Sequence, residues 1–348
     1  MERLPMKKIN TILVGLGRIG WHYHFKEILR HPGFNLVAVV DPEIPRLREA
    51  QTLCDARAYE NLADCLKDKN ADLVVIASPT KFHCEQVCTA LSQGLDVFCD
   101  KPLATSLADV DKMLASMKSH GRKLMVYQPH RVSPETQAIE HVLREGLLGP
   151  IHMMGFASSS YLRRSDWQAF KKLGGGILMN YGAHFIDLLL YLTASPAASI
   201  YGLTRCAASL GDADDVAKII IETEDSCILD IDLSHVSAIR TEPWAIHGKY
   251  GSMVSDEVNK EFLVRYVDPK SLPNSKANAH LAVSDRKYDS SRDLCWQTKT
   301  VAISDFTPLN YYQYCYGYFA LNHPPFVPVS ETREVMRLLK ACSKELAR

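Results

Sequence analysis

The chain has 348 residues, more than one hydrophobic core usually serves, so we expect two domains with a cleft between them. Its 40 Lys and Arg residues balance 40 Asp and Glu residues without long runs of one sign, which argues against nucleic acid and anionic membranes as partners. The first ten residues lead into a strand pattern rather than a signal or transit sequence, so a cytoplasmic protein is expected.

The first third of the chain alternates short apolar runs with amphipathic segments, which is typical of β–α–β units around a parallel sheet. The predicted strands span residues 9–17, 34–41, 71–79, 96–102 and 123–130. The predicted helices begin near Ile19, Pro42, Asn61, Thr80 and Ser106. Residues 1–129 are therefore predicted to form an α/β Rossmann domain, a doubly wound parallel sheet.

The second part of the chain, residues 130–348, is predicted to form an α+β domain with a mostly antiparallel sheet covered by helices on one face. One helix is expected from Pro134 to about Gly146, and another over about residues 331–347. The polar stretch 268–292 indicates a loop. The predicted strands span residues 151–161, 199–208, 214–234, 243–255 and 261–267.

Residues 15–20 read GLGRIG, a G-x-G-x-x-G motif between a predicted strand and a predicted helix. Glycines there allow a tight turn and bring backbone N–H groups close to a pyrophosphate. Asp41 ends the next predicted strand, where the ribose-binding acid of this fold belongs. Because a carboxylate repels a 2′-phosphate, NAD is predicted over NADP, although nearby Arg46 weakens that preference. The alternative is a glycine-rich turn followed by a surface aspartate.

Other cofactor contacts are expected where further strands end at the same edge of the sheet. His83 follows one such strand end and either touches ribose or caps the next helix. The predicted cofactor-binding residues are Gly15, Gly17, Arg18, Ile19, Gly20, Asp41, Ser78, Pro79, Thr80, His83, Asp100, Lys101 and Gln128.

Lys101 follows an apolar strand at the edge where a nicotinamide would lie, between Asp100 and Pro102. Desolvation and nearby cationic charge lower the pKa of a lysine, so its amine can exchange a proton with a substrate hydroxyl. The alternative is a lysine at the domain edge whose stem packs on apolar surface while its ammonium reaches water.

A second polar cluster interrupts the most apolar segment of the chain. Three glycines at 174–176, which would let the backbone pass close to a ligand, precede Asn180, His184 and Asp187, and helical spacing puts these three side chains on one face. A membrane-spanning helix would rarely carry such residues. The cluster indicates a substrate site, and the alternative is a buried helix whose polar groups satisfy each other.

Arg163, Arg164 and Trp167 precede the glycines and are predicted to face the cleft, where they would suit an anionic or phosphorylated sugar. The alternative is a pair of ordinary surface arginines. The predicted substrate-binding residues are Lys101, Arg163, Trp167, Asn180, His184 and Asp187.

The ten cysteines are scattered without a Cys-x-x-Cys pair and are predicted to be mostly reduced core residues. Cys84 and Cys88 share a predicted helix, but the second ligand pair of a zinc site is missing, so no metal is expected.

In this order and spacing, four motifs resemble the Gfo/Idh/MocA oxidoreductases over the whole chain. They are GLGRIG, Asp-Lys-Pro at 100–102 where the family usually has Glu-Lys-Pro, GLLGPIH at 146–152, and the glycine run ending in His184 and Asp187. The resemblance implies a Rossmann domain, then a domain with an open mixed sheet that often mediates homodimers or homotetramers. It also implies redox chemistry on sugars, cyclitols and similar polyols, with Lys101 and His184 as the catalytic pair beside the nicotinamide.

Asn180 departs from the family pattern, because many members carry an aspartate there that forms a dyad with the following histidine. Without that charge, His184 lacks the partner that would raise its basicity, although Asp187 could orient it. Some sugar-nucleotide dehydrogenases of the family also have asparagine at this position, so activity is still expected. We predict that Lys101 is the acid and base and that His184 polarises the reacting oxygen.

The sequence therefore predicts an NAD-dependent dehydrogenase that transfers hydride between the nicotinamide and a secondary hydroxyl of a sugar, sugar derivative or cyclitol. One alternative is a redox-neutral glycoside hydrolase that uses bound NAD transiently. Another is a non-catalytic dinucleotide-sensing protein, against which the presence of both Lys101 and His184 argues.

Overall fold

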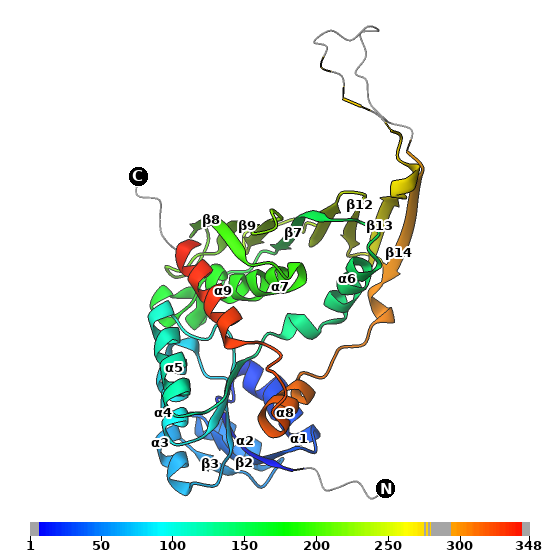
Figure 1. Cartoon of the computed structure of the whole chain (residues 1–348). Helices are drawn as coiled ribbons and strands as arrows, with labels where there is room; N and C mark the ends of the chain where they lie inside the picture. Colours follow the sequence, from blue (N-terminus) through cyan, green and yellow to red (C-terminus); the bar gives the residue numbers. More distant parts are fainter. Residues whose placement is uncertain (1–6, 275, 278, 280–293, 343–348) are drawn as a thin grey trace, which may run out of the picture.

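Six parallel strands form the first sheet, in the lower half of the computed structural model in Figure 1. The structure describes residues 7–274, 276–277, 279 and 294–342. The strand order β3-β2-β1-β4-β5-β6 confirms the predicted doubly wound fold. The strands are β1 (Ile9–Val14), β2 (Phe34–Val40), β3 (Arg57–Tyr59), β4 (Leu73–Ile76), β5 (Asp96–Cys99) and β6 (Leu124–Val126). The sequence did not predict β3, because this edge strand is only three residues long and has no apolar run.

Helices connect these strands and begin close to the predicted positions. Asn61 and Ser106 each accept a hydrogen bond from the backbone amide three residues later, and so cap α3 and α5. A π-helical turn, Gly20–Phe25, leads from the glycine motif into α1. The helices are α1 (Lys26–Arg30), α2 (Ile44–Gln51), α3 (Leu62–Cys65), α4 (His83–Ser92) and α5 (Leu107–Ser119).

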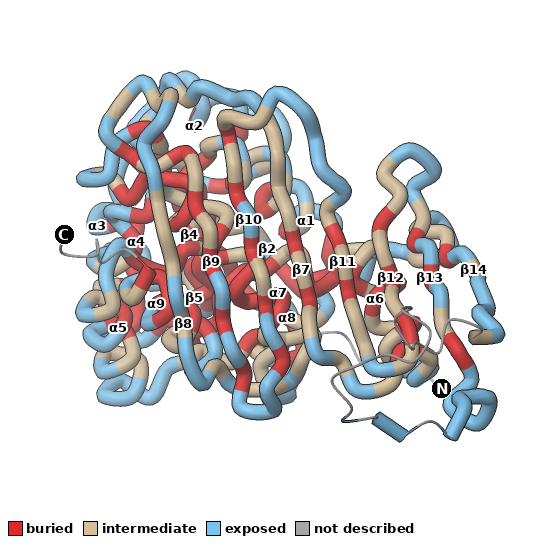
Figure 2. Tube along the Cα trace, turned by 90° about the horizontal axis from the view of Figure 1, so that it is seen from above, coloured by how far each residue is buried: buried red, intermediate tan, exposed pale blue. Residues whose placement is uncertain are grey.

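Eight strands form the second sheet, in the order β14-β13-β12-β11-β7-β10-β9-β8. Only β7 and β10 pair in parallel, so the predicted mostly antiparallel sheet is confirmed. Figure 2 shows buried and exposed residues alternating along these strands, as expected for a sheet covered on one face. The strands are β7 (Ile151–Ser159), β8 (Ala197–Arg205), β9 (Val216–Thr223), β10 (Ile228–Ser234), β11 (Trp244–Gly248), β12 (Gly251–Asp256), β13 (Glu261–Val267) and β14 (Trp296–Ala302).

Three predictions for this sheet need correction. The segment 214–234 is two strands, because the chain turns between β9 and β10, where Ser226 has a φ of 65°. The segment 243–255 is likewise two strands, β11 and β12. β14 was not predicted, because this edge strand is mostly exposed and polar. Of the predicted loop 268–292, the described part contains a 3₁₀ turn at Pro269–Ser271, and residues 275, 278 and 280–292 lie outside the described residues.

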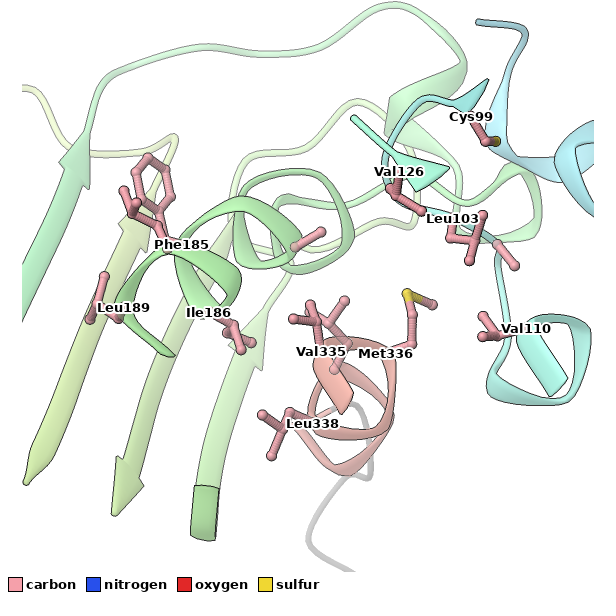
Figure 3. Packing of buried hydrophobic residues seen from close by; sticks show 14 of the residues in the cluster. Cys99, Leu103, Val110, Val126, Phe185, Ile186, Leu189, Val335, Met336 and Leu338 are labelled. Carbon is pink, nitrogen blue, oxygen red and sulfur yellow. The ribbon is translucent and has the colours of Figure 1, made fainter. Parts of the chain in front are cut away.

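Helix α9 (Val329–Cys342) joins the two halves of the molecule. α6 (Pro134–Glu145) and α9 lie close to their predicted positions, and predicted helical residues 343–347 lie outside the described part of the chain. Figure 3 shows Val335, Met336 and Leu338 of α9 between Ile186 of α7 (Ala183–Thr193) and Val110 of α5. One hydrophobic cluster therefore runs from the first sheet through α9 to the second sheet.

Helix α8 (Tyr311–Leu321) packs against the first sheet, although it follows the second sheet in sequence. Tyr311 and Tyr312 are fully buried beside Phe98 of β5 and Tyr127 after β6. The sequence did not predict α8, because the apolar and aromatic side chains of this helix are spread over all of its faces. They leave no amphipathic pattern. The predicted division into residues 1–129 and 130–348 stays a prediction.

Within the part of the chain that the structure describes, no helix combines the length and the apolar character required to cross a bilayer.

Candidate active site

The three motif glycines have different surroundings. Gly15 has a φ of +93°, and a Cβ there would lie 2.7 Å from the backbone of Ala77. A Cβ on Gly20 would lie 1.8 Å from the Gly15 carbonyl oxygen. Around Gly17, by contrast, no heavy atom lies within 4 Å of the position a Cβ would occupy. Gly15 and Gly20 thus serve the turn and the strand–helix packing, while Gly17 leaves the backbone open to a pyrophosphate, so the loop fits a dinucleotide.

Asp41 ties the end of β2 to the glycine loop. Its side chain is buried, and Oδ2 accepts a hydrogen bond from the Leu16 amide at 2.7 Å. Oδ1 accepts one from the Glu43 amide at 2.9 Å, and the Arg46 guanidinium approaches it at 3.4 Å. Asp41 therefore lies beside the open glycine, where a ribose contact remains our prediction. The positive charge of Arg46 partly compensates the negative charge of Asp41.

His83 braces the loops at the ends of β4 and β5 rather than offering a free edge to ribose. The ring is buried, with Nε2 2.8 Å from the Ser78 carbonyl and Nδ1 3.1 Å from the Pro102 carbonyl. Burial also lowers the pKa of His83. A neutral ring donates from only one nitrogen, but both nitrogens face backbone carbonyls, so the structure does not present His83 to a ribose. Ser78 donates its hydroxyl to Gln86 at 2.6 Å.

Lys101 bridges the two halves of the molecule at the carboxyl edge of the first sheet. Its Nζ donates to the backbone carbonyl of Asn180 at 2.7 Å and to the Asn180 Oδ1 at 2.8 Å. Burial lowers the pKa of Lys101 well below its usual range, and the cations Arg18 and Arg164 act in the same direction against the opposing charge of Asp100. Burial raises the pKa of Asp100. The predicted lysine base therefore has the environment that the prediction required.

His184 lies close to a second histidine, His130, which was not among the predicted site residues. The rings of His184 and His130 meet edge to face, with centroids 4.5 Å apart. Burial and the nearby Lys101 charge lower the pKa of His184 and lower that of His130 to about 4, so both rings are neutral near pH 7. Nδ1 of His184 is buried without a hydrogen-bond partner among the described residues. His130 follows the last parallel strand, and that position at the carboxyl edge is the signal that could have identified it.

Asp187 forms a buried ion pair and does not orient His184. Arg131 donates to its two carboxylate oxygens, from Nε at 2.7 Å and from Nη2 at 2.6 Å. The same Nη2 reaches Glu331 at the start of α9 at 2.8 Å. Since Arg131 occupies both oxygens, the predicted substrate contact and the predicted support of His184 are both corrected. Asp187 instead fixes α7 to the turn Pro129–Val132.

The glycine run at 174–176 admits protein atoms rather than a ligand. A Cβ on Gly175 would lie 2.3 Å from the Gln168 carbonyl oxygen, and one on Gly176 would lie 2.5 Å from Asp214 Oδ1. A Cβ on Gly174 would lie 2.9 Å from Thr105. The run therefore brings the segment containing Gln168 against the start of the helix that carries Asn180.

The two arginines before the glycine run separate. Arg163 is exposed and donates to the Ala208 carbonyl at 3.0 Å, so the structure does not bring it into the site. Arg164 is partly buried, and it lines a small pocket together with Gln168 and Asn180. Trp167 begins a 3₁₀ turn beside this pocket and is only partly buried.

Gln128 connects the end of β6 to the helix that bears His184. It is buried, its backbone amide donates to the Tyr311 hydroxyl at 3.1 Å, and its Nε2 donates to the Ala183 carbonyl at 3.3 Å.

The described residues contain no group of three or more His, Cys, Asp or Glu side chains arranged to hold a metal ion. The site therefore brings together the glycine loop, Lys101, Asn180 and His184, and it adds His130, Arg164 and Gln168.

Comparison with known proteins identifies the family. The model described as "Oxidoreductase family, NAD-binding Rossmann fold" matches residues 9–128, and the "GFO/IDH/MocA C-terminal domain" matches residues 136–254. A myo-inositol 2-dehydrogenase of Thermotoga maritima is 26% identical over 258 residues, which cover 72% of this chain and 76% of the relative. A scyllo-inositol 2-dehydrogenase (NAD(+)) of Bacillus subtilis is 28% identical over 238 residues, 66% of this chain and 68% of the relative.

Solved structures show the same fold. An NAD-binding protein from Listeria innocua superposes with a TM-score of 0.81 at 22% identity, covering 96% of this chain and 94% of its own. The WlbA dehydrogenase from Bordetella pertussis, in complex with NADH and UDP-GlcNAcA, superposes with a TM-score of 0.74 at 22% identity, covering 97% and 95%. Since the two family models together match more than half of the chain, the protein belongs to the Gfo/Idh/MocA family of oxidoreductases and carries an NAD-binding Rossmann fold.

Proposed function

We propose that the protein oxidises a secondary hydroxyl of a sugar, sugar derivative or cyclitol, using NAD. The observation that carries this proposal is the Lys101 amine, which lies at the carboxyl edge of the NAD-binding sheet and has a lowered pKa. NAD, when bound, accepts the hydride that leaves the substrate carbon. The inositol dehydrogenases among the relatives support this substrate class.

The residues of the chain divide the proton work between them. Asn180 occupies two of the hydrogen-bonding directions of the Lys101 amine and leaves one for the substrate hydroxyl. Since burial favours the neutral amine, Lys101 takes the hydroxyl proton as the carbon is oxidised and returns it in the reverse reaction. His184 stays neutral and polarises the reacting oxygen through a ring N–H. NAD is preferred over NADP because the Asp41 carboxylate would repel a 2′-phosphate. Arg164 is assigned to an anionic group of the substrate.

The test is NADH formation by the purified protein with NAD, or with NADP, across a panel of inositols, sugars, sugar acids and sugar nucleotides. NADH accumulation with one substrate class supports the proposal. If no substrate yields NADH while calorimetry shows that NAD binds, the dehydrogenase proposal is wrong and the redox-neutral hydrolase gains support.

The cytoplasmic location and the homodimer or homotetramer stay predictions.

A further inference from the structure

Asn180 presents Lys101 with an amide, where a carboxylate would offer two equivalent oxygens. An amide accepts hydrogen bonds at one end and donates them at the other. Oδ1 of Asn180 lies 2.8 Å from the Lys101 Nζ, so the amide nitrogen must point away from the lysine. If the amide turned over, its N–H groups would face the amine and this hydrogen bond would be lost. The geometry of Lys101 therefore depends on which way one amide points.

Gln168 contacts the other end of the Asn180 amide. The Asn180 Nδ2 donates to the Gln168 Oε1 at 3.2 Å, on the side away from Lys101. With Oε1 there, the Asn180 amide satisfies both of its ends in one orientation only. Gln168 and Asn180 line the same small pocket, and both are partly buried, which limits replacement of the bond by bulk water.

The backbone around Gln168 is held in place from two sides. The Asp166 carboxylate accepts the Gln168 amide at 3.0 Å and so caps the 3₁₀ turn Trp167–Ala169. The Gln168 carbonyl accepts the Gly176 amide at 3.0 Å, and the absence of a side chain on Gly175 permits this close approach. Gly175 and Gly176 thus help to hold the Gln168 backbone beside the start of the helix that carries Asn180.

We infer that Gln168 is a positioning residue, which fixes the Asn180 amide with its oxygen toward Lys101 and so holds the amine in its working position. For its catalytic meaning the inference rests on the proposed function. The role arises because this chain has an amide at residue 180, since a carboxylate presents an oxygen to Lys101 in either orientation.

The first experiment compares Gln168→Leu with Gln168→Glu in the full-length protein. The readout is the pKa of Lys101, taken from the pH dependence of its acetylation by acetic anhydride and measured by mass spectrometry. Gln168→Leu frees the amide to turn, so the charged amine loses an acceptor and the pKa of Lys101 falls further. Gln168→Glu keeps an accepting oxygen, so that pKa does not fall. If a substrate is known, Gln168→Leu also lowers kcat about tenfold, without raising the KM for NAD.

The second experiment repeats the substitution where the amide is gone. Asn180→Asp places a carboxylate beside Lys101 and raises the pKa of Lys101. Adding Gln168→Leu to Asn180→Asp should then leave the pKa of Lys101 nearly unchanged, because no amide remains to turn. An equal fall in both backgrounds would show that Gln168 acts through packing, and it would overturn the inference.

Two controls separate the possible failures. Gln168→Met repeats the measurement with a flexible side chain if Gln168→Leu does not fold, as judged by circular dichroism. Acetylation of Lys101 requires no turnover, so it tests the positioning role even if no substrate yields NADH. NADH formation together with an unaltered pKa of Lys101 in Gln168→Leu contradicts the positioning role and leaves the proposed function intact.

Discussion

At the scale of single residues, the site gathers basic side chains whose pKa values are lowered: His130 and His184 are neutral near pH 7, and Lys101, with a pKa of about 7, is neutral in part. Burial lowers the pKa of Lys101, His130 and His184, and neighbouring positive charge contributes to each shift. A neutral amine can accept the proton that a hydroxyl loses on oxidation, whereas an ammonium cannot. Desolvation raises the pKa of Asp100, the nearest carboxylate in sequence, so Asp100 compensates the positive charge only in part.

Lys101→Ala removes the proposed base and both hydrogen bonds to Asn180. General acid–base catalysis contributes about 10²–10⁴-fold to a rate, so kcat should fall by about that factor while NAD affinity stays close to that of the native protein. Stopped-flow turnover and calorimetric titration with NAD measure the two quantities. Full activity in Lys101→Ala would remove this residue from the mechanism.

The candidate residues themselves could be predicted from sequence, but their contacts could not. Lys101 and Asn180 are recognisable because each is polar in an apolar stretch, yet their hydrogen bonds cross from one half of the molecule to the other. Their pairing depends on how α9 packs between α5 and α7, and no local pattern encodes that packing. Asp187 was misassigned because helical spacing defines a face of the helix but does not reveal that Arg131 occupies it.

At the scale of elements, different glycines of the strand–turn–helix unit contribute to folding stability and to NAD binding. Gly20→Ala would force a methyl group into the Gly15 carbonyl, whereas Gly17→Ala would meet no protein atom. We therefore expect Gly20→Ala to lower the melting temperature with or without NAD. Gly17→Ala should melt near the native temperature without NAD but bind NAD at least about tenfold more weakly. Calorimetry on both variants checks this, and normal NAD binding by Gly17→Ala would contradict the dinucleotide assignment.

The contact between α7 and the turn before α6 depends on the buried pair Arg131–Asp187, whose side chains are 3% and 1% exposed. Arg131→Met leaves the Asp187 carboxylate buried without its main partner, so the free energy of unfolding should fall by about 3–5 kcal/mol. The double variant Arg131→Met/Asp187→Leu removes the stranded charge and should recover most of that loss. Urea unfolding measures both.

Arg337→Met on α9 is the matched control, because it breaks an exposed pair with Glu334 and should cost less than about 1 kcal/mol. An Arg131→Met variant as stable as this control would show that the Arg131–Asp187 pair does not fix α7.

The strand and helix predictions succeeded where the apolar pattern of an element was clear. They failed where an element lacked the usual alternation of apolar and polar residues. All strands of the first sheet except β3 could be predicted, because they are nearly continuously apolar. β14 carries polar side chains at an exposed edge, and α8 is apolar on every side, so neither has the alternation on which such predictions depend.

At the scale of the whole molecule, a buried histidine links stability to pH. Burial in the aromatic cluster between the first sheet and α8 lowers the pKa of His24 to about 3, and Nδ1 of His24 lies 2.8 Å from the Tyr312 hydroxyl. Since an unfolded histidine titrates near 6.5, the unfolded chain binds the proton first as the pH falls. The stability contribution of this group is complete above about pH 6.5 and is lost toward pH 3, by up to roughly 5 kcal/mol.

Denaturant unfolding from pH 7 to pH 4 measures this slope. His24→Leu should be less stable at pH 7, because the Tyr312 hydroxyl loses its partner, but its stability should depend less on pH. The exposed His22 serves as the control, and His22→Leu should keep the native slope. An identical slope in His24→Leu would assign the acid sensitivity to other groups.

Direct hydride transfer to NAD is tested by following the hydrogen itself. A substrate that yields NADH is labelled with deuterium at the carbon bearing the reacting hydroxyl, and the NADH formed is analysed by mass spectrometry. Deuterium should be transferred to NADH in the native protein, and Lys101→Ala should form the same labelled NADH much more slowly. NADH without deuterium, or deuterium appearing only in solvent, would contradict direct hydride transfer at this site.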